Sequence, residues 1–153
     1  MPDTIASPAA SIDLDEQPGH LIRRAHQIAV ASFHQHLGRE VTPVQYAMMR
    51  VLQARPGIDQ ATLAQEVALD TSTTADIAVR LESKGWISRA VLARGQRSLA
   101  LTEAGAALLG TLVPGMQDMQ TQLLDGLEME ERQELLRLLR KFVAPDSERR
   151  QAR

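Results

Sequence analysis

Between residues 58 and 86, apolar side chains recur at intervals of three and four residues, which predicts short helices. One apolar stripe covers residues 58–67 and a second covers residues 77–86, with a break at Leu69 and Asp70. Two short helices joined this tightly are the minimum of a helix-turn-helix unit. The pattern therefore indicates such a unit in the middle of the chain.

After residue 85 the pattern changes from helical to alternating. The segments 86–92 and 98–101 have strand propensity, and the loop between them carries Arg94 and Arg97. We therefore predict a β-hairpin with two arginines at or near its tip.

Longer helices are predicted on both sides of this unit. One covers residues 18–37, with a proline at its start and a glycine as its stop signal. Another follows Leu101, and Pro114 inside it should bend it, because proline removes an intrahelical donor. A last helix is predicted between Gly126 and Pro145.

A shorter helix is predicted between the first long helix and the helix-turn-helix unit. Thr42 and Gln45 form a capping box around Pro43, and the helix should end before Pro56. The predicted fold is mainly α with one small β-hairpin. It is a winged helix-turn-helix over about 43–101, with long dimerisation helices over about 18–38 and 102–143.

The long helices carry more apolar surface than a small winged helix can cover. The last helix alone has a stripe of five large apolar residues: Leu135, Leu136, Leu138, Leu139 and Phe142. A second copy of the chain is the simplest cover for such a surface, so we expect a homodimer.

Composition fits one small domain. The 153 residues are 44% hydrophobic, which is enough for a single core. We predict a disordered acidic tail at 1–16, one domain at 17–145 and a C-terminal tail at 146–153. No membrane span or signal peptide is recognisable, so we expect a cytoplasmic, nucleoid-associated protein.

Three classes of chemistry find no support in the sequence. With no cysteine, disulfides and thiol-based sensing are excluded. The four histidines, at positions 20, 26, 34 and 36, include no pair three or four apart, so we expect no metal site. No glycine-rich phosphate loop or catalytic motif occurs, and we expect neither an enzyme nor a bound cofactor.

The distribution of charge favours a nucleic-acid partner, although the net charge is −2. Residues 1–19 carry four acids and no lysine or arginine. From Arg80 to Arg97 one acid, Glu82, stands against five bases: Arg80, Lys84, Arg89, Arg94 and Arg97. The basic region coincides with the predicted second helix and hairpin.

Four segments of the chain form a recognisable set: Thr42–Tyr46, Gln60–Ala64, Asp70–Thr74 with Arg80–Ile87, and Leu101–Gly105. In these segments and their order, the chain closely resembles the MarR family of winged-helix regulators. The resemblance implies a dimer, formed by the first and last two helices, that reads a pseudo-palindromic operator in double-stranded DNA. One departure is that the family's wing usually has an aspartate beside its arginines, whereas residues 93–97 hold no acid, which predicts a looser wing.

The second helix of the unit supplies most of the predicted DNA contacts, because its N-terminal end faces the major groove in this motif. Short hydroxyl side chains there can bond to phosphates and base edges, or can simply cap the helix. They are Thr71, Ser72, Thr73 and Thr74.

Charged side chains complete the predicted DNA interface. Asp76 and Arg80 lie four residues apart, so they could form an ordinary exposed ion pair. Otherwise Arg80 contacts DNA, and Asp76 accepts from a cytosine amine or orients Arg80. Arg94 and Arg97 are expected to enter the minor groove or hold its phosphates, the alternative being solvated loop charges. Arg94 is the better candidate for the tip.

A small-molecule effector is also expected. In the family, small aromatic acids bind a cleft between the dimer helices and the DNA-binding lobe, and residues 18–25 are similar to regulators of aromatic-acid and nicotinate breakdown. Candidates for polar contacts with a carboxylate are His20, Arg24, His26 and Tyr46, with Met48, Met49 and Met116 as apolar walls. Each candidate could instead be an interface or surface residue.

We therefore predict a dimeric, sequence-specific transcriptional regulator, a repressor that a small aromatic carboxylate releases from its operator. Two alternatives stay open. One is a ligand-independent DNA-architectural protein, and the other is a protein-interaction module. The hydroxyl-rich start of the second helix favours base readout over the first, and the arginine-bearing wing favours nucleic acid over the second.

Overall fold

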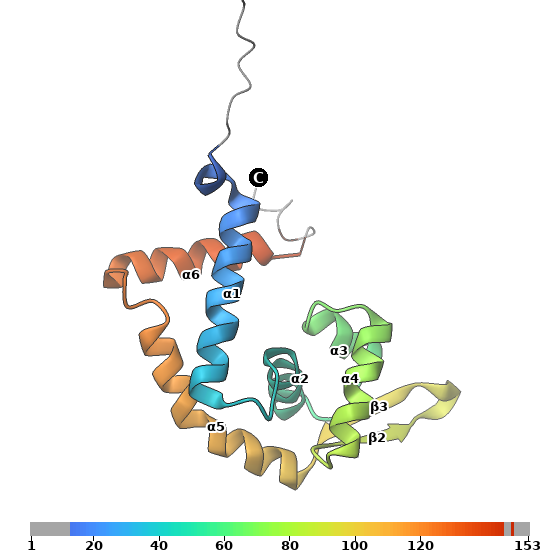
Figure 1. The fold of residues 1–153 in the computed structure, drawn as a ribbon. Coiled ribbons are helices and arrows are strands. Elements are labelled where there is room, and N and C mark those ends of the chain that lie inside the picture. Colours follow the sequence, from blue (N-terminus) through green and yellow to red (C-terminus); the bar gives the residue numbers. More distant parts are fainter. Residues whose placement is uncertain (1–12, 146–147, 149–153) are drawn as a thin grey trace, which may run out of the picture.

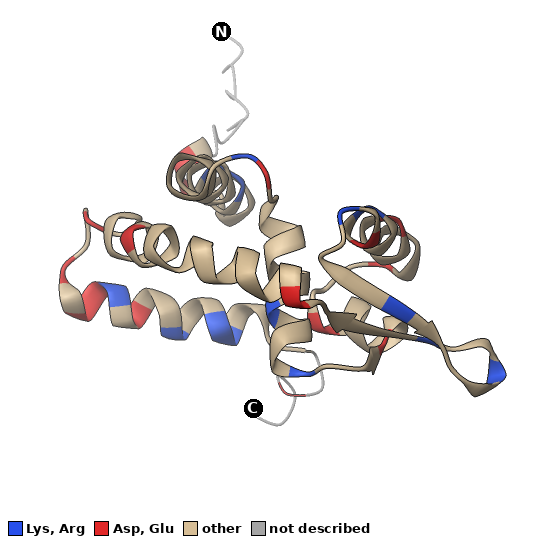
Figure 2. Ribbon diagram, turned by 90° about the horizontal axis from the view of Figure 1, so that it is seen from below, with Lys and Arg blue, Asp and Glu red and all other residues tan. Residues whose placement is uncertain are grey.

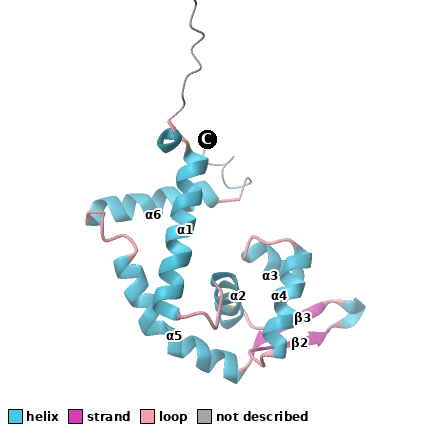
Figure 3. Ribbon diagram, in the orientation of Figure 1, coloured by secondary structure: helices cyan, strands magenta, loops and turns pink. Residues whose placement is uncertain are grey.

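The computed structural model describes residues 13–145 and residue 148, and most of these are helical (Figures 1 and 3). The elements, in chain order, are η1 (Leu14–Glu16), α1 (Pro18–Leu37), α2 (Pro43–Ala54), β1 (Ile58–Asp59), α3 (Gln60–Glu66), α4 (Thr71–Ser83), β2 (Ile87–Val91), η2 (Ala93–Gly95), β3 (Arg97–Leu101), α5 (Glu103–Gln122) and α6 (Met129–Val143). The predicted helices and the hairpin are confirmed.

Local capping explains where several helices begin. Thr42 accepts from the Gln45 amide, and the Gln45 side chain accepts from the Thr42 amide in return, which completes the predicted capping box. Thr102 caps α5 in a similar way by accepting from the Gly105 amide. These contacts satisfy amides that have no partner within the helix.

The sheet contains one strand more than the sequence pattern predicted. The strand order is β1-β3-β2, antiparallel throughout, with Ile58 opposite Leu99 and Val91 opposite Arg97. Assigning Ile58 to the first helix of the unit was wrong, because α3 begins at Gln60, after its cap Asp59. The two-residue strand has no period of its own and is defined by its pairing with β3.

The core of the winged lobe lies between α2, α3, α4 and the sheet. Its fully buried large residues are Val41, Met48, Met49, Leu52, Leu63, Thr74, Leu81, Ile87 and Leu99. Leu109 of α5 closes the core from the side of the long helices. Helices α3 and α4 and the sheet are therefore held in place by packing that extends to the first half of α5.

Helices α1 and α5 cross at very close range. A Cβ atom built on Gly115 would lie only 2.4 Å from the carbonyl oxygen of His36, so only glycine fits the crossing as it stands. Next to it, the Nε2 atom of His36 lies 3.2 Å from Oε1 of Gln122. Figure 1 shows that α5 changes direction along its length, and Pro114 within it supplies the physical reason.

Helix α6 packs little against the rest of its own chain. It has no buried residue and, within the described part of the chain, no extensive packing partner. Leu136, Leu138, Leu139 and Phe142 are between 43% and 57% exposed. Figures 1 and 2 show α6 on the side of the molecule away from the tip of the wing.

The predicted tails lie largely outside the described residues, which exclude 1–12, 146–147 and 149–153. Extending the disordered tail to residue 16 was wrong, because Leu14–Glu16 form a 3-10 turn capped by Asp13. In the described part of the chain, no helix is long and apolar enough to cross a membrane.

Candidate nucleic-acid interface

The N-terminus of α4 is organised by Asp70. Its Oδ1 accepts from the Thr73 amide at 2.7 Å, and its Oδ2 accepts from the Thr73 hydroxyl at 2.7 Å. These hydrogen bonds, the backbone one first, hold the pKa of the Asp70 carboxyl below its usual value because they stabilise the charged form. The cap therefore stays ionised and keeps the start of α4 in a defined position.

The four hydroxyl residues predicted to contact DNA have different environments. Thr71, Ser72 and Thr73 are exposed, whereas Thr74 is fully buried and donates to the Asp70 carbonyl oxygen at 2.8 Å. Assigning Thr74 to the DNA interface was therefore wrong, because none of its surface is accessible. The Thr73 hydroxyl already donates to Asp70, so its remaining capacity is as an acceptor.

Asp76 and Arg80 are both exposed on α4. Neither takes part in any of the four ion pairs found among residues 13–145 and 148, so the alternative of a mutual ion pair is not observed. Their charged groups are free to meet a partner outside the chain.

The wing is a narrow hairpin with Arg94 at its turn. Arg94 is exposed and has a left-handed backbone, with φ of 70°. The turn is closed by hydrogen bonds from the Leu92 amide to the Gln96 carbonyl and from the Gly95 amide to the Leu92 carbonyl. Arg97 is also exposed, but it is the first residue of β3 and pairs with Val91, so it lies beside the turn and not in it. Figure 2 shows a basic position at the far end of the wing.

An ion pair that the local sequence pattern does not predict joins the base of the wing to α4. The guanidinium of Arg89 donates twice to the Glu82 carboxylate, at 3.0 and 2.9 Å, and only 16% of the Arg89 side chain is exposed. These hydrogen bonds lower the pKa of Glu82, and the charge of Arg97 adds to the effect. The usable signal was that Glu82 is the only acid between Arg80 and Arg97.

Because this pair fixes the angle between β2 and α4, we expect Glu82→Gln to weaken DNA binding by roughly three- to tenfold. The matched control is Glu66→Gln, which breaks the exposed Arg55–Glu66 pair in the same lobe and should leave DNA affinity nearly unchanged. Fluorescence anisotropy with one duplex measures both variants. Equal losses in both would contradict a bracing role for Glu82.

Within the described residues, no hydrogen bond, ion pair or ring contact joins the four candidate effector residues to one another. The ring of Tyr46 packs edge-on against Phe33, with centroids 5.8 Å apart. His26 precedes Phe33 by seven residues, or two turns, and shares that face of α1. By the same helical spacing, His20 and Arg24 point to the opposite side of α1 and, within one chain, do not reach Tyr46.

The predicted apolar walls of the effector site need correction. Met48 and Met49 are fully buried in the core of the winged lobe, so neither can line an open cleft. Met116 of α5 is half-buried and can still do so.

The helix-turn-helix with a braced, arginine-tipped wing defines a winged-helix DNA-binding protein. A model of the MarR family matches residues 41–98. Across 137 residues the chain is 31% identical to the HTH-type transcriptional repressor NicR of Pseudomonas putida, covering 88% of this chain and 87% of NicR. The chain therefore belongs to the MarR family, and it is a transcriptional regulator rather than an enzyme.

Two solved structures are similar over most of the chain. The PcaV regulator of Streptomyces coelicolor, in complex with its natural ligand, is 32% identical with a TM-score of 0.82, covering 87% of this chain and 96% of PcaV. Bordetella bronchiseptica BpsR, whose DNA binding is regulated by 6-hydroxynicotinic acid, is 29% identical with a TM-score of 0.78, covering 84% and 94%.

Proposed function

We propose that this protein is a homodimeric repressor that leaves its operator when a small aromatic carboxylate binds. The observation that carries the DNA part is the outward face of α4, beside a wing that is braced to the same helix. On this face the side chains of Thr71, Ser72, Asp76 and Arg80 are exposed and have no side-chain partner within the described residues. The repressor and ligand parts are supported by NicR, PcaV and BpsR.

In this proposal the two recognition elements have different tasks. The hydroxyls of Thr71 and Ser72 and the charges of Asp76 and Arg80 meet base edges and nearby phosphates in the major groove. The Thr73 hydroxyl can only accept there. Arg94 at the turn enters the minor groove, and Arg97 on the strand contacts phosphate. Such a division separates sequence preference, which α4 supplies, from general affinity, which the wing supplies.

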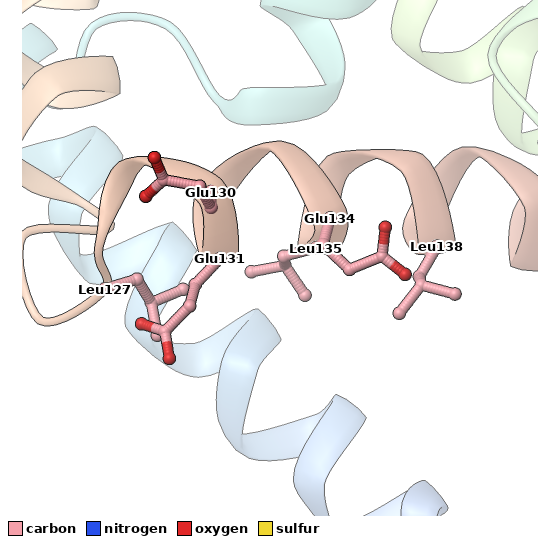
Figure 4. A pocket seen from close by; sticks show the side chains of 6 residues that line it. All are labelled: Leu127, Glu130, Glu131, Glu134, Leu135 and Leu138. Atoms are coloured by element: carbon pink, nitrogen blue, oxygen red, sulfur yellow. The ribbon is translucent and has the colours of Figure 1, made fainter.

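The dimer is supported by the uncovered face of α6. Figure 4 shows the side chains of Leu127, Leu135 and Leu138 on one side of this helix, where they line an open hollow. Three acids also line it: Glu130, Glu131 and Glu134. Leu21, Ile22 and Ile28 of α1 are also between 45% and 56% exposed. A second copy can bury both apolar surfaces at once, as a two-fold dimer requires.

The effector site is proposed beside the contact of α1 with α2. Tyr46 is half-buried against Phe33, and His26 on the same face of α1 can offer an imidazole to the ligand carboxylate. His20 and Arg24 can contribute only from the second copy. The ligand acts on DNA affinity by favouring a lobe spacing that does not match half-sites about 34–36 Å apart.

Calorimetry with hydroxybenzoates and hydroxynicotinates, on the free protein and on the protein bound to a duplex selected from a random library, tests this function. Linkage requires that the duplex weaken ligand binding by the same factor by which the ligand weakens DNA binding. Equal ligand affinity in both states, or no binding of any of these acids, would overturn ligand control. Failure to enrich any sequence would instead favour the architectural alternative.

A further inference from the structure

The outward face of α4 carries one feature that the fold does not require. Val79 is 48% exposed and is the only large apolar residue left exposed on this helix. The buried side of this helix consists of Thr74, Ala78 and Leu81, so Val79 is not needed for packing against the core. Val79 follows Ser72 by seven residues and Asp76 by three, so all three share one stripe of the outward face.

Asp76 on the same stripe is an exposed acid without an ion-pair partner in the described part of the chain. DNA phosphates repel a carboxylate, and a hydrogen bond that the carboxylate accepts from a base offsets this cost. In the major groove, the partner that suits a carboxylate is the N4 amine of cytosine. The exposed acid and the exposed valine therefore both point to pyrimidines, because the apolar group in this groove is the 5-methyl of thymine.

We propose that Asp76 and Val79 form a pyrimidine-reading pair, with Asp76 accepting from a cytosine N4 amine and Val79 packing on a thymine 5-methyl group. This inference rests on the proposed function, since it requires α4 to lie in the major groove. Three residues of helix rise by about 4.5 Å. Base pairs are stacked about 3.4 Å apart, so the two pyrimidines belong to neighbouring base pairs of each half-site.

The thymine contact is tested by removing one methyl group from the DNA. A duplex selected by the full-length protein from a random library is resynthesised with deoxyuridine in place of each thymidine in turn. At one thymine of each half-site, the replacement should lower the affinity of the wild-type protein roughly fourfold, because the methyl group that packs on Val79 is no longer there to be buried. Val79→Ala should bind the thymidine and deoxyuridine duplexes equally. The matched control Val113→Ala, at an α5 valine that is 46% exposed, should keep the fourfold difference.

The cytosine contact is tested by repeating the selection with Asp76→Asn. An asparagine pairs with adenine through N6 and N7, so one position of the half-site should change from cytosine to adenine. An unchanged selected sequence would overturn the role of Asp76. Wild-type protein that binds its selected duplex specifically but ignores every deoxyuridine, or a Val79→Ala variant that keeps the penalty, would overturn the role of Val79. Both results leave the proposed function standing, whereas absence of any selected sequence rejects that function itself.

Discussion

Gly105→Ala is expected to lower the free energy of unfolding by about 3 kcal/mol or more, because the new methyl group has no space. A Cβ atom at this position would lie 2.1 Å from the carbonyl oxygen of Trp86 and 2.8 Å from a methyl carbon of Leu101. The Trp86 oxygen cannot easily move, since it accepts from the Thr102 amide at 3.0 Å at the start of α5. Relief would require α5 to separate from the sheet.

Gly110→Ala is the matched control on the same helix. Nothing lies within 4 Å of a Cβ atom built at Gly110, so alanine should stabilise α5 by about 0.5–1 kcal/mol through its better helix propensity. Urea unfolding followed by circular dichroism measures both variants. If Gly105→Ala proves as stable as Gly110→Ala, the close contact of α5 with Trp86 is not present in solution.

A second large effect is expected from the double variant Leu135→Glu and Leu138→Glu. These side chains line the open hollow of α6, and charges there cannot be buried against a second copy without a large desolvation cost. Light scattering should give a mass near the 16.8 kDa of one chain, in place of twice that value for the wild type. Because one protomer can hold only one half-site, operator affinity should fall by roughly 10²-fold or more.

Arg140→Ala controls for changes on α6 in general. Arg140 is exposed and lies on the side of the helix away from Leu135 and Leu138, so this variant should stay dimeric. A double glutamate variant that keeps the mass of two chains would show that the dimer uses another surface. A wild-type monomer that binds operator tightly would reject the dimer altogether.

Signals that act over a few residues were sufficient to predict most elements. Thr42 with Gln45, Asp70 with Thr73 and Gly38 act within one turn of the helix ends, so their effect can be read from neighbouring positions. The alternating apolar and polar residues on both sides of Arg94 predicted the strands of the wing, because strand alternation is also visible between neighbouring positions. The family resemblance followed from such local segments, and the match over residues 41–98 agrees with it.

Tertiary packing decided what local patterns could not. The two-residue strand β1 exists because Ile58 pairs with Leu99, 41 positions further along the chain. Thr74 was indistinguishable from Thr73 in the sequence, and only the packing of α4 onto the core turned its hydroxyl away from the outward surface. The bond between Glu82 and Arg89 crosses from a helix to a strand, and the angle between those elements is not set by the residues that separate them. Helical periodicity states which residues share a face, but what covers that face depends on contacts between distant segments.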